Sequence, residues 1–148
     1  MQILLVDDDP FVRESIGSCL RELGHSVQEC ADGAAGLKAY RQSPFPMVLS
    51  DLRMPEMNGI SLTRAIKKLP EGKNSDVVLL TGYGDMNSAV EALRAGAYDY
   101  VVKPVSMTEL ASLTDRIAEH QALLHENRRL TENFQTEVAS ATEETRQE

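Results

Sequence analysis

The sequence has no excess of basic residues and no long hydrophobic run. Its 15 Lys and Arg residues stand against 23 Asp and Glu residues, which gives a formal net charge of −8 at pH 7. General binding to nucleic acid needs a basic surface, so this charge argues against it. No stretch approaches the roughly 18 consecutive apolar residues that span a bilayer. The opening MQILLVDDDP also lacks the basic leader and apolar core of a secretory signal, and we expect no membrane association.

Cysteine is scarce. Cys19 and Cys30 are the only two, and both lie at apolar-patterned positions with no metal-ligand spacing around them. Structural disulfides persist in oxidising compartments, whereas cytosolic thiols stay reduced. We interpret both residues as reduced core thiols and expect a cytoplasmic protein.

The sequence does contain five short runs of strand length, separated by helical patterns. Four of them are almost continuously apolar, as in strands of a parallel sheet that helices cover on both faces. The runs are Ile3–Val6, Met47–Leu49, Val77–Leu80 and Tyr100–Val102, with the weaker Ser26–Cys30 as the fifth. Five strand–helix units in about 120 residues predict a doubly wound α/β sandwich.

Helix signals fill the intervals between these runs. Asp9 is placed to cap a first helix that Pro10 opens and Gly24 ends. Ser106 and Glu109 have the spacing of a capping box and predict the start of a fifth helix. Beyond residue 121 the strand–helix pattern is finished, yet helix-favouring sequence continues. We therefore expect one domain over residues 1–121 and a helical extension over residues 122–148.

Acidic and polar side chains gather where the expected strands end. The carboxyl ends of parallel strands meet at one edge of such a sheet, and ligands bind there. The residues at these positions are Asp7, Asp8, Asp51, Thr81 and Lys103. Two bare carboxylates about 4 Å apart repel by roughly 4 kcal/mol at an effective dielectric constant near 20. A proton or a cation must then lie between them, and oxygen ligands with room for water suit a hard ion such as Mg²⁺.

The lysine and the threonine extend this site towards phosphoryl transfer. Lys103 supplies a positive charge and Thr81 a hydroxyl, which with a cation would surround the oxygens of a phosphoryl group on a carboxylate nucleophile. Taken singly, an Asp here is usually a helix cap, a Lys a surface group and a Thr a local hydrogen-bonding residue. Their coincidence at one edge favours the phosphoryl site.

Four segments resemble the response-regulator receiver family over about residues 2–120. They are ILLVDDDP, VLSDLRMPEMNG, VVLLTGYGD and GAYDYVVKP, and their separations fit as well: 43 residues from Asp8 to Asp51, 30 to Thr81 and 22 to Lys103. The resemblance implies a flavodoxin-like (βα)5 fold with parallel strand order 2-1-3-4-5. It also implies that a sensor histidine kinase, or a small acyl phosphate, donates the phosphoryl group.

The resemblance assigns a role to each residue of the site. Asp51 is the implied phosphoacceptor. The implied metal ligands are Asp8 directly, Asp7 largely through water, Asp51, and the backbone carbonyl of Arg53. Thr81 and Lys103 are implied to bind the phosphoryl oxygens, and Lys103-Pro104 to be a cis peptide. Mg²⁺ is the implied cofactor, with Mn²⁺ as a substitute.

The same resemblance implies a switch. Phosphorylation changes the charge of Asp51 from about −1 to nearly −2. Thr81 is then drawn to the phosphoryl group, Tyr100 turns into the space it leaves, and the face of the fourth helix, fifth strand and fifth helix changes. Such a chain is a regulatory phosphoacceptor, which catalyses only its own phosphorylation and slow dephosphorylation. We also expect Tyr83 to slow dephosphorylation by shielding the phosphoryl group.

The extension carries a short seam of its own. Leu123, Asn127, Leu130 and Phe134 follow 4-3-4 spacing, with Asn at a core position, which indicates a parallel coiled-coil homodimer. A single solvated helix is the alternative, because Glu137 occupies the next seam position. The chain ends in TEETRQE without a helix stop, and we expect an output domain to follow. TGYGD with a long helix after it is similar to receivers placed before AAA+ transcription activators, while a kinase or second-messenger enzyme is an equal alternative.

Three other functions fit the sequence less well. A phosphatase of the haloacid-dehalogenase type needs a second Asp two places after its nucleophile, where this chain has Arg53. A flavin-binding flavodoxin needs a Ser/Thr/Gly-rich phosphate loop after the first strand, where three acids would repel phosphate. A non-phosphorylated pseudo-receiver that acts as a dimerisation module is disfavoured by the intact set Asp8, Asp51, Thr81 and Lys103.

Overall fold

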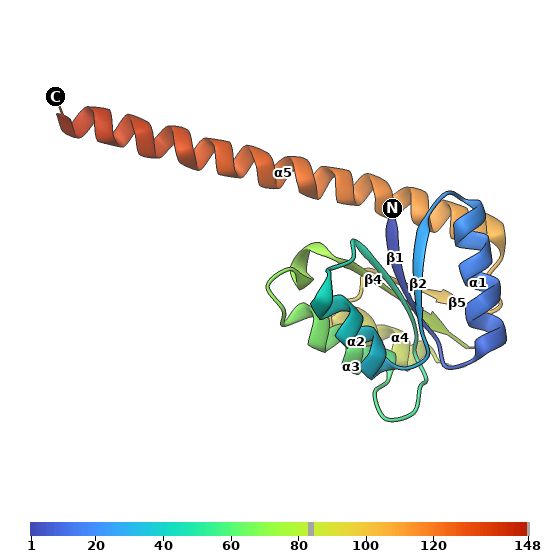
Figure 1. Ribbon diagram of the computed structural model, residues 1–148. Helices are drawn as coiled ribbons and strands as arrows, with labels where there is room; N and C mark the ends of the chain where they lie inside the picture. The colour runs from blue at the N-terminus through green and yellow to red at the C-terminus, as the bar shows by residue number, and fades with distance from the viewer. Residues whose placement is uncertain (83–84, 148) are drawn as a thin grey trace.

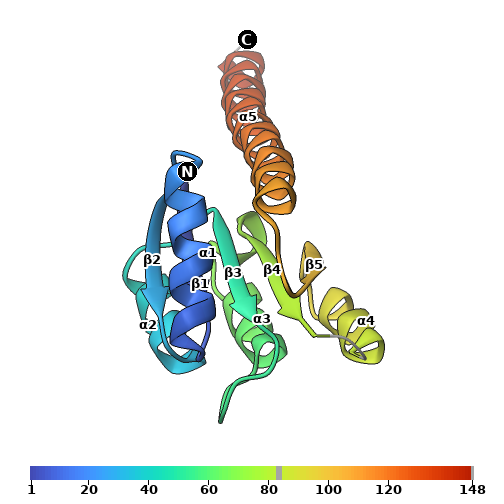
Figure 2. The same ribbon diagram turned by 90° about the vertical axis from the view of Figure 1, so that its right-hand side faces the viewer.

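The computed structural model describes residues 1–82 and 85–147, with side chains up to residue 127 apart from that of Met86. Its centre is a five-stranded parallel sheet (Figure 1), with the strands in the order β2-β1-β3-β4-β5 (Figure 2). The strands are β1 (Gln2–Val6), β2 (Ser26–Cys30), β3 (Met47–Asp51), β4 (Asp76–Thr81) and β5 (Asp99–Val102). The predicted flavodoxin-like order is therefore confirmed.

Helices cover both faces of this sheet. They are α1 (Pro10–Glu22), α2 (Gly33–Gln42), α3 (Gly59–Lys67), the short 3₁₀ helix η1 (Gly72–Asn74), α4 (Met86–Arg94) and α5 (Met107–Gln147). α1 and the first part of α5 lie on one face, and α2, α3 and α4 on the other (Figure 2). Each face has its own hydrophobic core, so the fold is a three-layer sandwich.

The central strands divide their side chains between the two cores. Ile3 and Leu5 of β1 pack under α1 and α5, while Leu4 and Val6 pack under α2 and α3. Successive side chains of a strand point to opposite faces, so a strand covered on both sides must be apolar throughout. All four residues are fully buried, as the continuous apolar run predicts.

The edge strand β5 departs from that expectation. Tyr100 and Val101 are only half-buried, and Val102 is 37% exposed. The prediction that this run is buried on both faces is wrong, because β5 is an edge strand with a neighbour on one side only. The observed strand ends also differ from the predicted ones by a residue or two. Asp51 and Thr81 are the last residues of β3 and β4, whereas the prediction placed them after these strands.

Side-chain caps fix the start of most helices. The carboxylate of Asp9 accepts hydrogen bonds from the backbone N–H groups of Phe11 and Val12, at 2.9 and 3.3 Å. Asp32, Asn58 and Ser106 accept from first-turn N–H groups of α2, α3 and α5 in the same way. The predicted caps at Asp9 and Ser106 are thus confirmed, and α1 ends before Gly24, whose φ is +93°.

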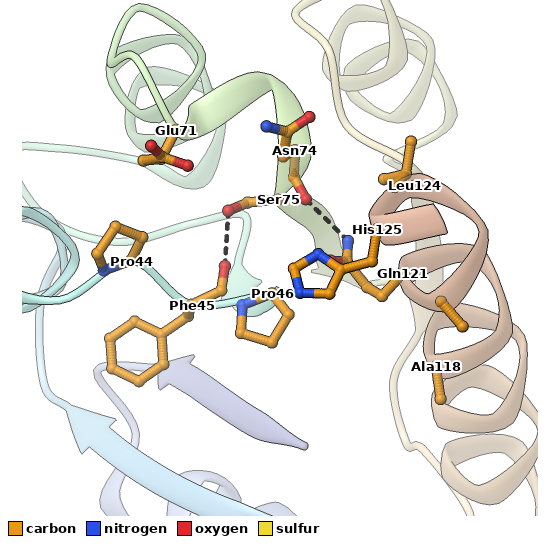
Figure 3. A pocket seen from close by; sticks show the side chains of 11 residues that line it. Pro44, Phe45, Pro46, Glu71, Asn74, Ser75, Ala118, Gln121, Leu124 and His125 are labelled. Atoms are coloured by element: carbon orange, nitrogen blue, oxygen red, sulfur yellow. Dashed lines mark hydrogen bonds between the residues drawn. The ribbon is translucent and has the colours of Figure 1, made fainter. Parts of the chain in front are cut away.

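Helix α5 leaves the domain at the amino edge of the sheet, opposite the carboxylate cluster (Figure 1). There the buried carboxylate of Asp76 contacts Nδ1 of His120 at 2.7 Å and Nε2 of Gln121 at 2.9 Å. Gln121 also donates to the carbonyl of Asn74, beside a hollow of about 510 Å³ between α5 and the loops before β3 and β4 (Figure 3). The sequence reasoning missed this contact, which fastens α5 to β4.

Both cysteines are free thiols, Cys30 buried and Cys19 partly buried, as predicted. Among the described residues, no helix combines the length and apolar content that a membrane crossing requires.

Gly59 at the start of α3 sets the position of the loop after Asp51. A Cβ atom on Gly59 would lie 2.5 Å from the backbone oxygen of Asp51 and 2.9 Å from Cδ2 of Leu79. The backbone oxygen cannot rotate away as a side chain would, so only glycine allows α3 to approach β3 this closely.

We predict that Gly59→Ala lowers the free energy of unfolding by about 2 kcal/mol, as overpacking of a core does. The measurement is urea unfolding followed by far-ultraviolet circular dichroism, since the chain has no tryptophan. Gly17→Ala in α1 is the matched control, because a Cβ there meets only the ends of the Glu29 and Arg21 side chains. Equal stability of the two variants would contradict the argument.

Candidate functional site

Three carboxylates meet at the carboxyl edge of the sheet. β1 and β3 are neighbours, with Val6 paired to Ser50, so the residues that follow them lie side by side. One carboxylate oxygen from each of Asp7, Asp8 and Asp51 lies within 4.8 Å of the other two. Asp7 is fully buried and Asp51 is 8% exposed, whereas Asp8 faces solvent. The predicted gathering of these acids is present.

Lys103 lies between two of these acids. Its Nζ atom is 3.1 Å from Oδ2 of Asp7 and 3.2 Å from Oδ1 of Asp51. The other oxygen of Asp7 accepts a hydrogen bond from the backbone N–H of Asp9 at 2.9 Å. Both oxygens of Asp7 therefore have protein partners. The Lys103–Pro104 peptide bond is cis, as the family resemblance implies.

Burial and an excess of negative charge, three carboxylates against the single Lys103, act together on the pKa of Asp51. Burial, and then the charge of Asp7, raises the pKa of Asp51 to about 6, although the charge and hydrogen bond of Lys103 act in the opposite direction. Burial lowers the pKa of Lys103, but its hydrogen bond to Asp7 and the charge of Asp51 outweigh burial, and the net pKa is raised. An added cation would relieve this excess.

Thr81 ends the strand next to Asp51. Asp51 pairs with Leu80 across β3 and β4, so Thr81 is one residue further along the same edge. It is buried, and its hydroxyl donates a long hydrogen bond of 3.4 Å to the carbonyl of Val101 on β5. Tyr100, beside Val101, is half-buried against the core that lies under α2, α3 and α4. The hydroxyl thus faces β5 here, and the predicted partners Thr81 and Tyr100 belong to adjoining strands.

The side chain of Arg53 has a partner that the sequence reasoning missed. Its Nε atom lies 3.1 and 3.2 Å from the two carboxylate oxygens of Asp85, and Nη2 contacts the same carboxylate. The hydrogen bond from Arg53 lowers the pKa of Asp85. Sequence inspection assigned Arg53 only a backbone role, because 32 residues separate the pair and no local pattern links them.

The remaining predicted residues lie partly outside the described structure. Leu123 and Asn127 are exposed on α5, which accords with a seam that needs a partner. The side chains of Leu130 and Phe134, like residue Tyr83, lie outside the described residues. The seam and the shielding role of Tyr83 stay predictions.

Residues 3–115 match the family model of the response regulator receiver domain. The chain belongs to this family. The receiver is 35% identical over 136 residues to the regulatory protein AtoC of Escherichia coli (strain K12), an alignment that covers 91% of this chain and 29% of AtoC. It is 34% identical over 128 residues to the C4-dicarboxylate transport transcriptional regulatory protein DctD of Rhizobium meliloti, covering 86% of this chain and 27% of DctD. The chain thus spans less than a third of the length of these relatives.

A solved structure gives the same result for the fold. The receiver domain of the sensor histidine kinase PA1611 from Pseudomonas aeruginosa PAO1 superposes with a TM-score of 0.73 at 32% identity, covering 79% of this chain and 97% of that one. That structure has a magnesium ion coordinated in its active-site cleft. The receiver family and fold expected from the sequence are confirmed.

Asp51 should destabilise the metal-free receiver when it ionises. Its pKa is raised to about 6 in the folded state, so the native state holds the proton more tightly than the unfolded chain. Stability is therefore lost as the pH rises from about 4 to about 6. Asp51→Asn removes this titration, and we predict that it raises the free energy of unfolding at pH 7.5 in EDTA by on the order of 2 kcal/mol.

Urea unfolding at pH 4 and pH 7.5 checks this prediction, since the difference between wild type and variant should nearly vanish at pH 4. Asp32→Asn is the matched control, because Asn caps a helix about as well as Asp and should leave stability within about 0.5 kcal/mol. An Asp51→Asn variant no more stable than wild type at pH 7.5 would mean that the pocket is not strained by its charge.

Proposed function

We propose that this receiver is the phosphoacceptor of a two-component system, in which Asp51 takes a phosphoryl group from a sensor histidine kinase. The observation that carries the proposal is the contact of Lys103 with Asp7 and Asp51 inside a cluster of three carboxylates. A charge excess of this kind suits the binding of a cation together with a transferable anionic group. Membership of the receiver family supports the same function.

The acidic cluster fits a magnesium ion. Three carboxylate oxygens within 4.8 Å of one another are the donor set of a hard dication that keeps some of its water. Both oxygens of Asp7 are already hydrogen-bonded, so we assign direct ligation to Asp8, Asp51 and the backbone carbonyl of Arg53, and contact through water to Asp7. The metal supplies neutralisation of the charge on the phosphoryl oxygens, and Mn²⁺ should substitute for it.

The transfer itself needs few protein groups. A carboxylate oxygen of Asp51 attacks phosphorus, a P–O bond forms, the P–N bond to the kinase histidine breaks, and the imidazole leaves with its electron pair and takes up a proton. Lys103 and Thr81 hold the phosphoryl oxygens in line for this step. To do so, the hydroxyl of Thr81 must release the carbonyl of Val101 and donate to a phosphoryl oxygen instead. The hydrogen bond that it gives up is weak, because it is 3.4 Å long.

The output surface follows from the same movement. When Thr81 turns towards Asp51, the half-buried ring of Tyr100 gains room next to β4, and the face formed by α4, β5 and α5 changes. Exposed apolar side chains gather on these elements: Val90, Leu93, Val102, Met107 and Leu123. We propose that this face and the α5 seam, with Leu123, Asn127, Leu130 and Phe134, form a homodimer.

The receiver is proposed to occupy residues 1–121, with residues 122–148 as a helical linker to an output domain. Relatives such as DctD are transcriptional regulatory proteins more than three times as long as the aligned region. An output domain of the AAA+ activator type is therefore the first candidate, and a signalling enzyme is the second.

Phosphorylation can be tested by mass spectrometry after incubation with acetyl phosphate and Mg²⁺. We predict one added phosphoryl group on wild type, none on Asp51→Asn and none in EDTA. Lys103→Ala and Thr81→Ala should react about tenfold to a hundredfold more slowly, because each removes a group that stabilises charge in the transition state. Lys68→Ala, on the exposed end of α3, is the matched control and should react like wild type. Labelling of Asp51→Asn, or no labelling of any protein, would contradict the proposal.

Self-association tests the proposed face. We predict that wild type bound to beryllofluoride and Mg²⁺ dimerises in sedimentation equilibrium, and that Leu93→Glu weakens dimerisation at least tenfold by placing a charge in an apolar contact. Phe11→Glu is the control, because Phe11 is an even more exposed apolar residue but lies on α1. Equal dimerisation of the two variants would place the interface elsewhere.

A further inference from the structure

Asp85 holds the N-cap position of α4 but does not cap the helix. Asp9, Asp32, Asn58 and Ser106 each accept a hydrogen bond from a first-turn N–H group. The side chain of Asp85 makes no such bond, although Asp is among the best capping residues. Within the described residues, α4 therefore differs from α1, α2, α3 and α5, whose first-turn N–H groups do have a side-chain cap.

Other partners occupy this carboxylate. Both of its oxygens face the guanidinium of Arg53, and the backbone N–H of Gly82 hydrogen-bonds to it as well. The Asp85 side chain is only 7% exposed, whereas that of Arg53 is 77% exposed. The buried acid is therefore paired with a cation whose side chain is mostly exposed to solvent.

The ion pair joins the two loops that flank the phosphoryl site. Arg53 comes two residues after Asp51, and Gly82 comes directly after Thr81. A phosphoryl group on Asp51 would carry nearly two negative charges and three strong acceptor oxygens, against one charge on Asp85. A guanidinium forms its strongest hydrogen bonds with such an anion and can present two parallel donors to it.

We propose that the phosphoryl group on Asp51 draws Arg53 away from Asp85, and that Asp85 then caps α4. The inference rests on the proposed phosphorylation of Asp51. Arg53 is here a positioning residue for α4, acting through Asp85. This change of partner adds a second path for the signal, besides the one through Thr81 and Tyr100. The second path ends on α4, the helix that carries Val90 and Leu93.

The physical effect falls on the first turn of α4. An N-cap side chain accepts from the second or third helical residue, which in α4 is Asn87 or Ser88. With only nine residues, α4 depends on its ends more than a long helix does. Gaining this bond should order the first turn and fix the direction in which the helix presents its exposed apolar side chains.

Amide hydrogen exchange at Asn87 and Ser88 measures the cap directly, with beryllofluoride and Mg²⁺ as the phosphoryl mimic. In wild type we expect exchange to slow about fivefold when the mimic binds. Arg53→Gln should show the slow rate without the mimic and no further slowing with it. Asp85→Ala should show the fast rate in both states, because it has neither ion pair nor cap.

Arg64→Gln is the matched control. Arg64 of α3 also pairs with an acid of α4, Glu91, at 3.5 Å, but both of these side chains are exposed, and this variant should respond like wild type. The Nε–H resonance of Arg53 should also shift when the mimic binds to wild type.

Fluorine-19 resonances of bound beryllofluoride separate this inference from the proposed function. If wild type binds the mimic while amide hydrogen exchange at Asn87 and Ser88 stays unchanged, the proposed change of partner by Asp85 is wrong. The proposed phosphoryl site still stands in that case. The same conclusion follows if Arg53→Gln binds the mimic and still shows the wild-type change. If wild type gives no fluorine-19 resonance of bound beryllofluoride, both this inference and the proposed function are overturned.

Discussion

The crowding of three carboxylates at one edge of a parallel sheet is the constraint on which this receiver is built. Each of the strands β1 and β3 is committed to two apolar cores, so the chain can place acids only where these strands end. The acids then converge because parallel strands end at the same edge. Lys103 balances part of their charge, while burial and the charge of Asp7 raise the pKa of Asp51. The pocket is stable, but it favours any ligand that adds positive charge.

The parts of this arrangement that could be predicted from the sequence are those with a local signal. The inner strands are continuous apolar runs, Asp9 stands directly before a helix-opening proline, and the acids follow the strands within a residue or two. The ion pairs Arg53–Asp85 and His120–Asp76 have no such signal, since each joins side chains more than 30 residues apart whose geometry depends on loop conformation. The partial exposure of β5 was missed for a related reason, because a strand's place at the edge is a property of the whole sheet.

Strand β4 links the two ends of the molecule. At its carboxyl end Thr81 contacts β5 beside the phosphoryl site, and at its amino end Asp76 is held by His120 and Gln121 of α5. β4 is paired on both sides, so under the proposed switch a change at Thr81 would reach α5 through a strand rather than through a loop. The contacts of His120 and Gln121 with Asp76 hold the first part of α5 on the domain, and the helix then extends away from it (Figure 1). The proposed linker over residues 122–148 would carry such a change onwards.

The two buried acids near the site differ in their pairing with cations. Asp51 shares Lys103 with Asp7, and burial followed by the charge of Asp7 raises its pKa, whereas Asp85 has Arg53 to itself, and the hydrogen bond from Arg53 lowers its pKa. The unphosphorylated domain therefore distributes its cations unevenly, with the stronger pairing away from the phosphoacceptor. Under the proposed phosphorylation, Asp51 would carry nearly two negative charges against one on Asp85, which would reverse that ranking. The proposed redistribution acts on α4, the helix for which Asp85 makes no side-chain cap bond in the present pairing.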